Sequence, residues 1–327
     1  MKAIVYCDFG PPDVLRFQEI EKPVPNDSQV LIKVRAASIN PYDWHFMRGI
    51  PYVMRFEAGL RKPKDLRFGG DVAGQVEALG KNVTQFKPGD EVFGLCSGAF
   101  AEYCLGRSKL ALKPKNMSFE QAAAVPVAAV TALQALRDKG KIQPGQKVLI
   151  NGASGGVGTF AVQIAKSFGA NVTGVCSGRN AELVRSLGAD RVIDYTKEDF
   201  SKGEERYDLI IDNVGTQPLS GFRRVLKANG RCVLIGGGGP EEGKWIGPMA
   251  RPIKALFLSP FISQEVGMMI ASVGPEDLSF LGDLMRAGKV TPVIDKTYSL
   301  RELPAAIEYL EKGHARGKVV ITVGSGP

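Results

Sequence analysis

Residues 147–170, KVLINGASGGVGTFAVQIAKSFGA, decide the fold class of this chain. An apolar strand at 148–150 runs into a turn rich in glycine, and a helix with one apolar face follows. The turn has the spacing Ala153-x-Gly155-x-x-Gly158. Glycines let the backbone approach a pyrophosphate, and the helix N-terminus then offers free N–H groups to it. The order strand, turn, helix predicts a dinucleotide-binding unit, with a purely structural glycine turn as the alternative.

The end of the second strand, 171–177, indicates which dinucleotide is bound. An NAD-binding unit places Asp or Glu there to bind the ribose 2′-hydroxyl. This strand instead ends Ser177-Gly178-Arg179-Asn180, with no acid. A hydroxyl and a guanidinium suit a 2′-phosphate, because Arg forms a charge-assisted fork on it. The sequence therefore favours NADPH, against the alternative that Arg179 only opens the next helix.

Composition excludes several classes of protein. The chain has 327 residues, 44% of them apolar, which suffices for two globular domains. The net charge of +8 is scattered, which suits an anionic cofactor and indicates no specific nucleic-acid partner. Five cysteines without a CxxC pair suggest reduced thiols in the cytoplasm. We expect no secretory signal, because the start of the chain lacks a charged region followed by an apolar one. We expect no membrane span, because no run of about 18 apolar residues exists.

The first 118 residues are rich in strands separated by Gly and Pro turns, which predicts a β-barrel-like unit. The expected strands are 2–7, 29–37, 72–79, 91–94 and 99–105. Residues 118–121, Ser-Phe-Glu-Gln, form a capping-box pattern that opens a helical stretch at 122–136 around Pro126.

From residue 147 the pattern alternates strictly between strand and helix. Strands are expected at 147–151, 171–177, 190–195, 207–213 and 231–236, and helices at 157–168, 180–188 and 218–228. Such alternation predicts a parallel, doubly wound sheet. Residues 266–272 are a candidate sixth strand. A helix is expected at 275–287. More helix and then a terminal strand at 318–323 are expected after it. The proline-broken apolar segment 245–262 is expected to be a loop over a cleft or an interface.

In this order and spacing, a series of short motifs resembles the medium-chain dehydrogenase/reductase superfamily. Within it the chain is most similar to the zinc-free quinone oxidoreductases of zeta-crystallin type and the related reticulon-interacting and alkenal reductases. The resemblance implies a GroES-like catalytic domain, 1–122 with 273–327, and a Rossmann domain, 123–272, with the cofactor in the cleft between them. The motifs are ASINPYD (37–43), GDVAGQV (70–76), FKPGDEV (86–92), GAFAEY (98–103), the glycine turn, DNVG (212–215) and HARGK (314–318).

No metal site is expected. A catalytic zinc needs about three protein ligands, and this chain has only two histidines, at opposite ends, and no cysteine cluster. Zinc-containing relatives of the resembled family place Cys where this sequence has Asn40 and His where it has Gly70. Without a metal, the protein must polarise an acceptor carbonyl by hydrogen bonding. Quinones and α,β-unsaturated carbonyls are electrophiles that suit hydride delivery from NADPH under those conditions.

The candidate catalytic residues come from the segment that follows the expected strand 29–37 near the start of the chain. Asn40 is expected to hydrogen-bond the substrate or the nicotinamide, and Tyr52 or His45 to donate a proton, with solvent as the alternative donor. Asp43 is either part of this group or a helix cap. His45 is otherwise a surface or hydrogen-bonded histidine, and many relatives of zeta-crystallin type carry Tyr at or near its position.

The expected cofactor site draws on the whole chain. Asn213 follows the fourth strand at the carboxyl edge of the sheet, where ligands bind in open α/β folds. Resemblance implies a role for Tyr195 near the adenine ribose-phosphate and for the motif 314–316, although Arg316 is alternatively a plain surface charge. The full predicted set is Ser154, Gly155, Gly156, Val157, Gly158, Ser177, Arg179, Tyr195, Asn213, Gly236, Gly237, Met268, His314, Ala315 and Arg316.

The hypothesis that follows is a zinc-independent NADPH-dependent reductase of quinones or α,β-unsaturated carbonyls. Two alternatives stay open: an enoyl-thioester reductase, and a non-enzymatic NADPH-binding sensor or RNA-binding protein. We also expect a small-molecule substrate, a cytoplasmic location and a homodimer. The dimer is expected to form near the candidate edge strand 266–272 and the apolar residues 255–261, because an unpaired apolar strand aggregates unless it is covered.

Overall fold

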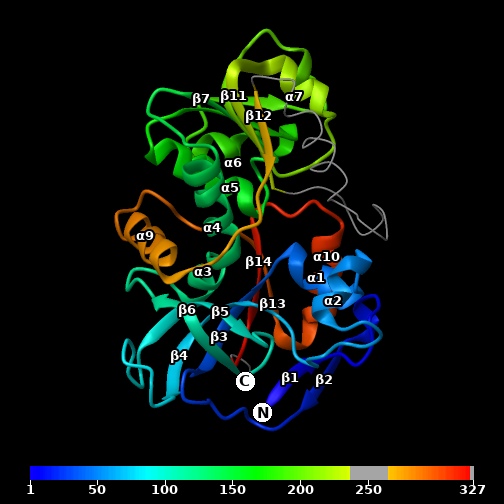
Figure 1. The fold of residues 1–327 in the computed structure, drawn as a ribbon, viewed down its shortest axis with the longest axis vertical. Helices are drawn as coiled ribbons and strands as arrows, with labels where there is room; N and C mark the ends of the chain where they lie inside the picture. The colour runs from blue at the N-terminus through cyan, green and yellow to red at the C-terminus, as the bar shows by residue number, and fades with distance from the viewer. Residues whose placement is uncertain (236–263, 325–327) are drawn as a thin grey trace. The chain divides into compact units, whose positions relative to one another are not determined.

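The computed structural model describes residues 1–235 and 264–324, which fall into two compact units (Figure 1). Unit 1 comprises Met1–Val130, Val273–Gly288 and Pro292–Pro327, and unit 2 comprises Thr131–Ser272 and Lys289–Thr291. The domain limits predicted from the sequence differ by a few residues, since 123–130 fall in unit 1 and 289–291 in unit 2. The assignment of catalytic and cofactor-binding roles to these two units stays a prediction.

Unit 2 is built on six parallel strands in the order β12-β11-β10-β7-β8-β9. The chain therefore runs outward from β7 in one direction and then, from β10, in the other, as a doubly wound sheet requires. This confirms the parallel, doubly wound sheet. The strands are β7 (Lys147–Asn151), β8 (Asn171–Cys176), β9 (Arg191–Asp194), β10 (Tyr207–Asp212), β11 (Leu226–Leu234) and β12 (Glu265–Met268).

The crossover helices of unit 2 are α5 (Gly156–Ser167), α6 (Ala181–Ser186) and α7 (Leu219–Val225). The helix predicted over 218–228 ends three residues early, because Leu226 is already extended and opens β11. The apolar core beside α7 contains Phe200, Phe222 and Tyr207, all buried. The segment 255–261, proposed for the dimer interface, and the loop predicted over 245–262 lie outside the described residues.

Unit 1 contains a six-stranded sheet in the order β13-β14-β3-β4-β5-β6. An additional pairing of β3 with β6 closes part of this sheet into a barrel. A separate antiparallel pair joins β1 and β2. The strands are β1 (Lys2–Val5), β2 (Arg16–Glu19), β3 (Val30–Ile39), β4 (Asp71–Leu79), β5 (Glu91–Ser97), β6 (Tyr103–Leu112), β13 (Ile294–Ser299) and β14 (Lys318–Thr322).

The strand predicted over 99–105 is wrong in its position, since β6 occupies Tyr103–Leu112. Residues 99–101 are fully buried without alternation, and they contact β1 instead: Ile4 N donates to Phe100 O, and Ala3 bridges Ala101. The apolar run 99–101 is therefore a buried segment of the core, and the strand begins after it.

A capped helical segment leads the chain from unit 1 into unit 2. The capping box at Ser118 is confirmed: Gln121 N donates to Ser118 Oγ (3.1 Å), and Ser118 N donates to Gln121 Oε1 (3.0 Å). The helix predicted over 122–136 is interrupted, because Pro126 starts a new helix. Its elements are α3 (Phe119–Ala123), α4 (Pro126–Gln134), which passes into unit 2 at Thr131, and a π-helical turn in unit 2, Ala135–Lys139. The remaining helices are α1 (Pro41–Arg48), α2 (Arg55–Ala58), α9 (Pro275–Arg286) and α10 (Leu303–Glu311). No helix in the described residues is long and apolar enough to span a bilayer.

Candidate functional site

The glycine turn of unit 2 holds its shape through a close backbone approach. Gly158, in the first turn of α5, packs on the preceding loop so tightly that a Cβ there would lie 2.0 Å from Gly152 O. Gly152 itself has a φ of +79°, which favours glycine. Gly155 is the N-cap of α5, and a Cβ on it would meet only Gly152 O, at 3.5 Å. Glycine is thus structurally required at 152 and 158, while Gly155 leaves open space at the helix N-terminus.

A buried polar network lies where the strand order reverses, between β7 and β10. Asn213 N and Nδ2 both donate to Asn151 O, at 3.2 and 3.0 Å. Asn151 Nδ2 donates in turn to Asp212 Oδ1 (2.9 Å), which also accepts from Val214 N and Gly215 N. Because a carbonyl oxygen can only accept, the amide of Asn213 is fixed with its nitrogen towards Asn151. Its Oδ1 then lies buried without a hydrogen-bond partner among the described residues.

A second such oxygen lies beside the phosphate turn. Asn180 Nδ2 donates to Ser154 Oγ (3.0 Å), and Asn180 Oδ1 is buried without a partner in the described part of the chain. Buried polar atoms are nearly always paired, and an orphaned one costs roughly 1–3 kcal/mol. Asn180 and Asn213 are the residues with buried orphan atoms in the described ranges, and both lie at the carboxyl edge of the sheet. This arrangement fits a bound polar ligand that supplies the missing donors.

The predicted 2′-phosphate site has a free cation. Arg179 is exposed and makes no hydrogen bond or ion pair with residues 1–235 and 264–324. Tyr195 N donates to Cys176 O (3.1 Å), which holds Tyr195 next to the end of β8, where Ser177 begins the turn. Tyr195 is 59% exposed. Ser177, Arg179 and Tyr195 therefore lie at neighbouring strand ends with side chains available to a ligand.

Asp194 is a residue of this site that sequence reasoning missed. Its carboxylate accepts from Thr196 N (3.1 Å) and Thr196 Oγ1 (2.8 Å). These bonds, led by that of the Thr196 hydroxyl and joined by one from the Gly178 backbone, hold the pKa of Asp194 below its usual range. A Cβ on Gly178 would lie 2.4 Å from Asp194 Oδ2. An acid therefore does border the turn 177–179, but it supports the backbone of that turn from the next strand.

The predicted catalytic segment of unit 1 begins at a buried helix cap. Asn40 precedes α1, and its N–H donates to Asp43 Oδ2 (2.7 Å). Asp43 is buried, and the loss of water raises its pKa to about 7 in spite of that hydrogen bond. The helix-capping role that the sequence left open for Asp43 is therefore present. Its use in catalysis stays a prediction.

Asn40 also belongs to a cluster beneath α1 (residues 38, 40, 71 and 318). Asp71 Oδ2 accepts from Ser38 Oγ and from Asn40 Nδ2, each at 2.8 Å. Asp71 Oδ1 accepts from Val127 N (3.1 Å). Lys318, on β14, donates to Ile39 O (3.1 Å) and to Asn40 Oδ1, and its Nζ lies 3.6 Å from Asp71 Oδ2. Burial lowers the pKa of Lys318 from its usual value, against the attraction of Asp71 and Asp43.

His45 and Tyr52 have different surroundings. His45 Nδ1 lies 2.7 Å from Ile50 O, so Nδ1 carries the proton, and burial lowers the pKa of the ring. The neutral ring then presents Nε2 as an acceptor, which takes a proton but does not give one. Tyr52 is half-buried after the end of α1, with its ring 4.7 Å from the Arg55 guanidinium. Tyr52 thus keeps the better chemistry for a proton donor.

The motif 314–316 forms the turn between α10 and β14. Asp295 Oδ2 accepts from Arg316 N (3.0 Å) and from Tyr309 Oη (2.6 Å), which fixes the backbone of this turn. His314 and Arg316 are exposed, and Ala315 is half-buried. Met268 ends β12 and is half-buried. Gly236 and Gly237 lie outside the described residues.

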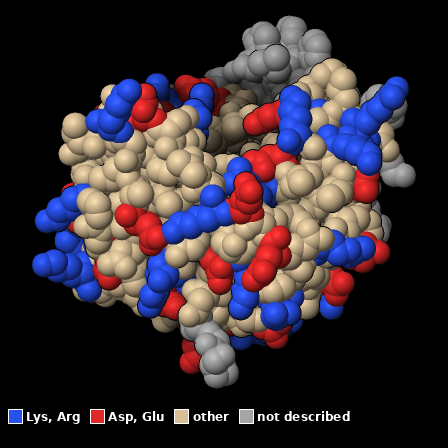
Figure 2. Space-filling view, turned by 90° about the horizontal axis from the view of Figure 1, so that it is seen from below, with Lys and Arg blue, Asp and Glu red and all other residues tan. Residues whose placement is uncertain are grey.

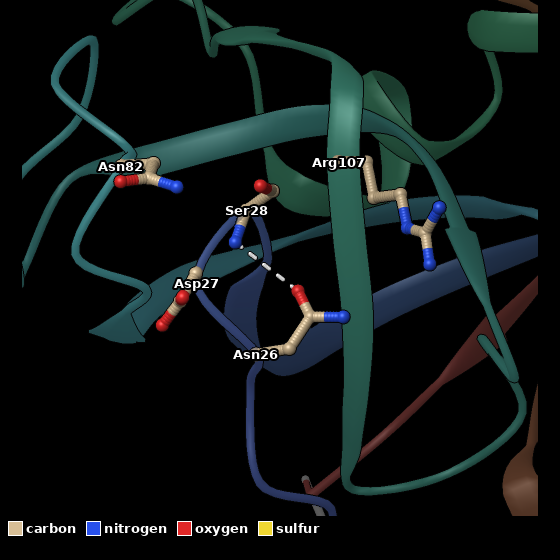
Figure 3. A pocket seen from close by; sticks show the side chains of 5 residues that line it. All are labelled: Asn26, Asp27, Ser28, Asn82 and Arg107. Atoms are coloured by element: carbon tan, nitrogen blue, oxygen red, sulfur yellow. Dashed lines mark hydrogen bonds between the residues drawn. The ribbon is translucent and has the colours of Figure 1, made fainter.

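Two further observations concern metal ligands and a surface hollow. In residues 1–235 and 264–324, no group of three or more His, Cys, Asp or Glu side chains gathers as a metal site would require. A hollow of about 580 Å³ lies on the barrel of unit 1, lined by exposed polar side chains (Figure 3). It contains none of the predicted site residues, so we do not assign it a role in the reaction. Its lining residues are Asn26, Asp27, Ser28, Asn82 and Arg107.

Comparison with known proteins decides the family. Residues 26–193 match the alcohol dehydrogenase GroES-like domain, and residues 187–321 match the family described as zinc-binding dehydrogenase. The mouse (Mus musculus) mitochondrial NAD(P)H oxidoreductase RTN4IP1 is 36% identical over 99% of this chain and 89% of its own. The chain belongs to the quinone oxidoreductase family of the medium-chain dehydrogenases/reductases. This confirms both the resemblance and the GroES-like plus Rossmann α/β fold class.

Two other members of the family resemble this chain over its whole length. The 2-methylene-furan-3-one reductase of tomato (Solanum lycopersicum) is 36% identical over 98% of this chain and 79% of its own. The crystal structure of Escherichia coli quinone oxidoreductase complexed with NADPH superimposes with a TM-score of 0.83. It is 26% identical and covers 99% of this chain and 100% of its own.

Proposed function

We propose that this medium-chain reductase uses NADPH to reduce quinones or α,β-unsaturated carbonyls, without zinc. The observation that carries the proposal is the orphaned Oδ1 of Asn213 at the reversal of strand order, beside the glycine turn. NADPH, when bound, supplies a hydride to the acceptor. Asn213 and Asn180 would accept hydrogen bonds from it, and the α5 N-terminus at Gly155–Gly158 would take the pyrophosphate.

Preference for the 2′-phosphate is supported by charge. Arg179 offers an exposed guanidinium, and Ser177 and Tyr195 offer hydroxyls at neighbouring strand ends. The carboxylate of Asp194 accepts hydrogen bonds from Thr196 and from the Gly178 backbone, so it supports the turn 177–179 and is not a free acid placed to bind a ribose hydroxyl. Relatives named for NAD(P)H and NADPH agree with this choice.

The acceptor class is supported by the names of relatives and by the residues around Asn40. One relative is named for an enone and another for a quinone, and both compounds develop negative charge on an oxygen as they accept hydride. Asn40 would donate a hydrogen bond to that oxygen, and Tyr52 or solvent would supply the proton. The Asn40 amide uses one of its two N–H groups on Asp71, which leaves the other for an acceptor.

The oligomeric state and the cellular location are also part of the proposal. We propose a homodimer that covers β12, one of the two outer strands of the described sheet of unit 2. The five cysteines, none of them in a disulfide, support a reducing compartment such as the cytoplasm, although the mouse relative is named as mitochondrial. Charges of both signs alternate over the face shown in Figure 2, which is unlike the basic stripe of a nucleic-acid-binding surface.

The test is a panel of acceptors after dialysis against EDTA. NADPH consumption is followed with quinones, alkenals, enones and enoyl-CoA thioesters, and bound zinc is measured by elemental analysis. We expect turnover with a quinone or an enone, and well under one zinc per chain. Turnover only with thioesters would favour the enoyl-thioester reductase. Zinc at one per chain, with activity lost on its removal, would refute the metal-free reaction. NADPH binding without turnover of any acceptor would leave the sensor hypothesis.

Two substitutions test the catalytic residues. Asn40→Ala and Tyr52→Phe should each lower turnover about 10-fold and leave the affinity for NADPH unchanged. Loss of an oxyanion donor commonly costs 10²–10³ in rate, and we expect less because water can supply the proton. Full activity in both variants would place the active site elsewhere. His45→Ala should leave the pH profile unchanged, because the Nδ1–H of the neutral ring is bonded to Ile50 O and Nε2 has no proton to give.

A further inference from the structure

An ion pair is fully buried beneath the predicted catalytic segment. Lys318 and Asp71 have side chains that are 4% and 0% exposed, and their charged atoms lie 3.6 Å apart. Replacing a buried ion pair with apolar residues is often neutral or stabilising, so such a pair is weak evidence for a stabilising role. The pair joins β14 to β4, strands far apart in the sequence. Its contacts indicate what it does instead.

The Lys318 ammonium lies among three groups of the protein. It donates hydrogen bonds to Ile39 O and Asn40 Oδ1, which belong to the residues where β3 ends and α1 is capped. Asp71 Oδ2, at 3.6 Å, is its ion-pair partner. Because the Lys318 side chain is only 4% exposed, any effect that it has on the reaction must pass through a neighbour.

The neighbour is the carboxamide of Asn40. Lys318 can only donate, so the amide must turn its oxygen towards the ammonium. Asp71, when ionised, can only accept, so the amide must turn its nitrogen towards the carboxylate. The two charges act on opposite ends of one amide and allow a single orientation. The remaining N–H of Asn40 is then directed by the pair, and the bond from the cation to the amide oxygen strengthens that N–H as a donor.

We propose that Lys318, paired with Asp71, is a positioning residue for the reduction, and that it acts by fixing and polarising the Asn40 amide. The inference rests on the proposed function, in which Asn40 donates to the developing oxyanion. Asp43 lies in the same electrostatic environment, since it interacts with both charges, and its contact with the Asn40 N–H holds the backbone of the same residue. Side chain and backbone of Asn40 are thus held by separate groups.

The test removes both charges together, because removing one would leave the other buried and unpaired. The double variant Lys318→Met with Asp71→Asn is compared with wild type, in the presence and in the absence of Asn40→Ala. We expect the double variant to lower kcat about 10-fold without changing KM for the acceptor. In the Asn40→Ala background the same change should cost less than about 2-fold. An equal loss in both backgrounds would show that the pair does not act through Asn40 and would overturn the proposal.

A second readout needs no turnover. With asparagine labelled by ¹⁵N, the side-chain amide of Asn40 is identified by its loss in Asn40→Ala, and its hydrogen exchange is measured by NMR. We expect exchange at least about 10-fold faster in the double variant; unchanged exchange would overturn the proposal. Faster exchange in a chain that reduces no acceptor would uphold the fixed amide and refute the proposed function. The two failures are therefore distinguishable.

Lys113 offers a matched control for both readouts. It is another lysine of unit 1 whose side chain is 5% exposed, and its Nζ contacts Glu91 at 3.1 Å. Lys113→Met removes a buried ammonium remote in sequence from the Asn40 cap and should change neither kcat nor Asn40 exchange. Urea unfolding of all variants checks that each is folded. If Lys113→Met lowered kcat and speeded Asn40 exchange as much as the double variant, the effect would be general and the proposal overturned.

Discussion

Arg179 and Asn40 show two ways in which a single side chain can be prepared for a ligand. Arg179 is exposed and has no partner among the described residues, so its charge is available to a phosphate at little cost. Asn40 is buried, and its amide is held by a lysine and an aspartate. The first arrangement favours affinity and the second favours orientation. We therefore expect substitution of Arg179 to change cofactor binding, and changes around Asn40 to alter turnover.

Cofactor preference tests the first of these. We expect NADPH to bind at least ~10-fold more tightly than NADH, which is about 1.4 kcal/mol. Arg179→Ala should remove most of that difference by lowering the affinity for NADPH alone, because the fork on the 2′-phosphate is lost. Fluorescence titration with both cofactors measures it. Arg185→Ala, at an exposed arginine on α6, is the control and should leave the ratio intact. Equal affinities in the wild-type chain would contradict the assignment.

Asp43 gives a pH dependence of stability. Its pKa is about 7 in the folded protein, against about 3.9 in an unfolded chain. The folded state therefore binds the proton more tightly, and stability falls as the pH rises from about 4 to about 7. Asp43→Asn stays neutral, so its free energy of unfolding should increase relative to wild type between pH 5 and pH 8. Urea unfolding at both values measures this, with the exposed Asp13→Asn as control. If the difference in free energy of unfolding between Asp43→Asn and wild type did not change with pH, the pKa of Asp43 would be the same in the folded and the unfolded chain.

At the scale of elements, β12 is the strand edge that bears on assembly. It is one of the two outer strands of the sheet of unit 2, and among the described residues it pairs with β11 on one side only. Two residues after it, Ile270 is 76% exposed. Unpaired strand edges with apolar neighbours aggregate unless another chain or element covers them. This supports dimer formation at this edge.

Sedimentation tests the dimer. We expect wild type at micromolar concentration to have twice the mass of the 35.2 kDa chain. Ile270→Lys should shift it towards monomer, because a charge would be buried at the interface. Val24→Lys changes an apolar residue of unit 1 that is 85% exposed, and should leave the mass unchanged. A wild-type monomer would refute the dimer, and a dimer unaffected by Ile270→Lys would move its interface elsewhere.

For the whole molecule, the sequence predicted what depends on local pattern. Alternation of strand and helix was sufficient for the parallel sheet of unit 2, and the glycine spacing located the turn whose close approach requires Gly158. The predicted limits of elements were wrong in two kinds of place. One is a fully buried run without alternation, as at 99–101, and the other is a helix that passes directly into a strand, as at Leu226.

Contacts between residues far apart in the chain could not be predicted from the sequence. Asp194 supports the turn that follows another strand, and nothing in the sequence around Asp194 indicates this. The sequence pattern marks Lys318 only as part of a family motif. The proposed role of Lys318 depends on Asn40, 278 residues away, and on Asp71. The pairing of β14 with β3, and of β3 with β4, brings the three together. Candidate binding residues were predictable because glycine and arginine act locally, whereas the residues that position them were not.

The most direct test of the central claim is the fate of a labelled hydride. NADPH carrying deuterium at both C4 positions of the nicotinamide is incubated with an enone acceptor, and the product is analysed by NMR. The account predicts deuterium on the β-carbon of the saturated ketone, at one per NADPH consumed, in protein dialysed against EDTA. A product without deuterium at that carbon, or no product from any enone or quinone, would contradict it.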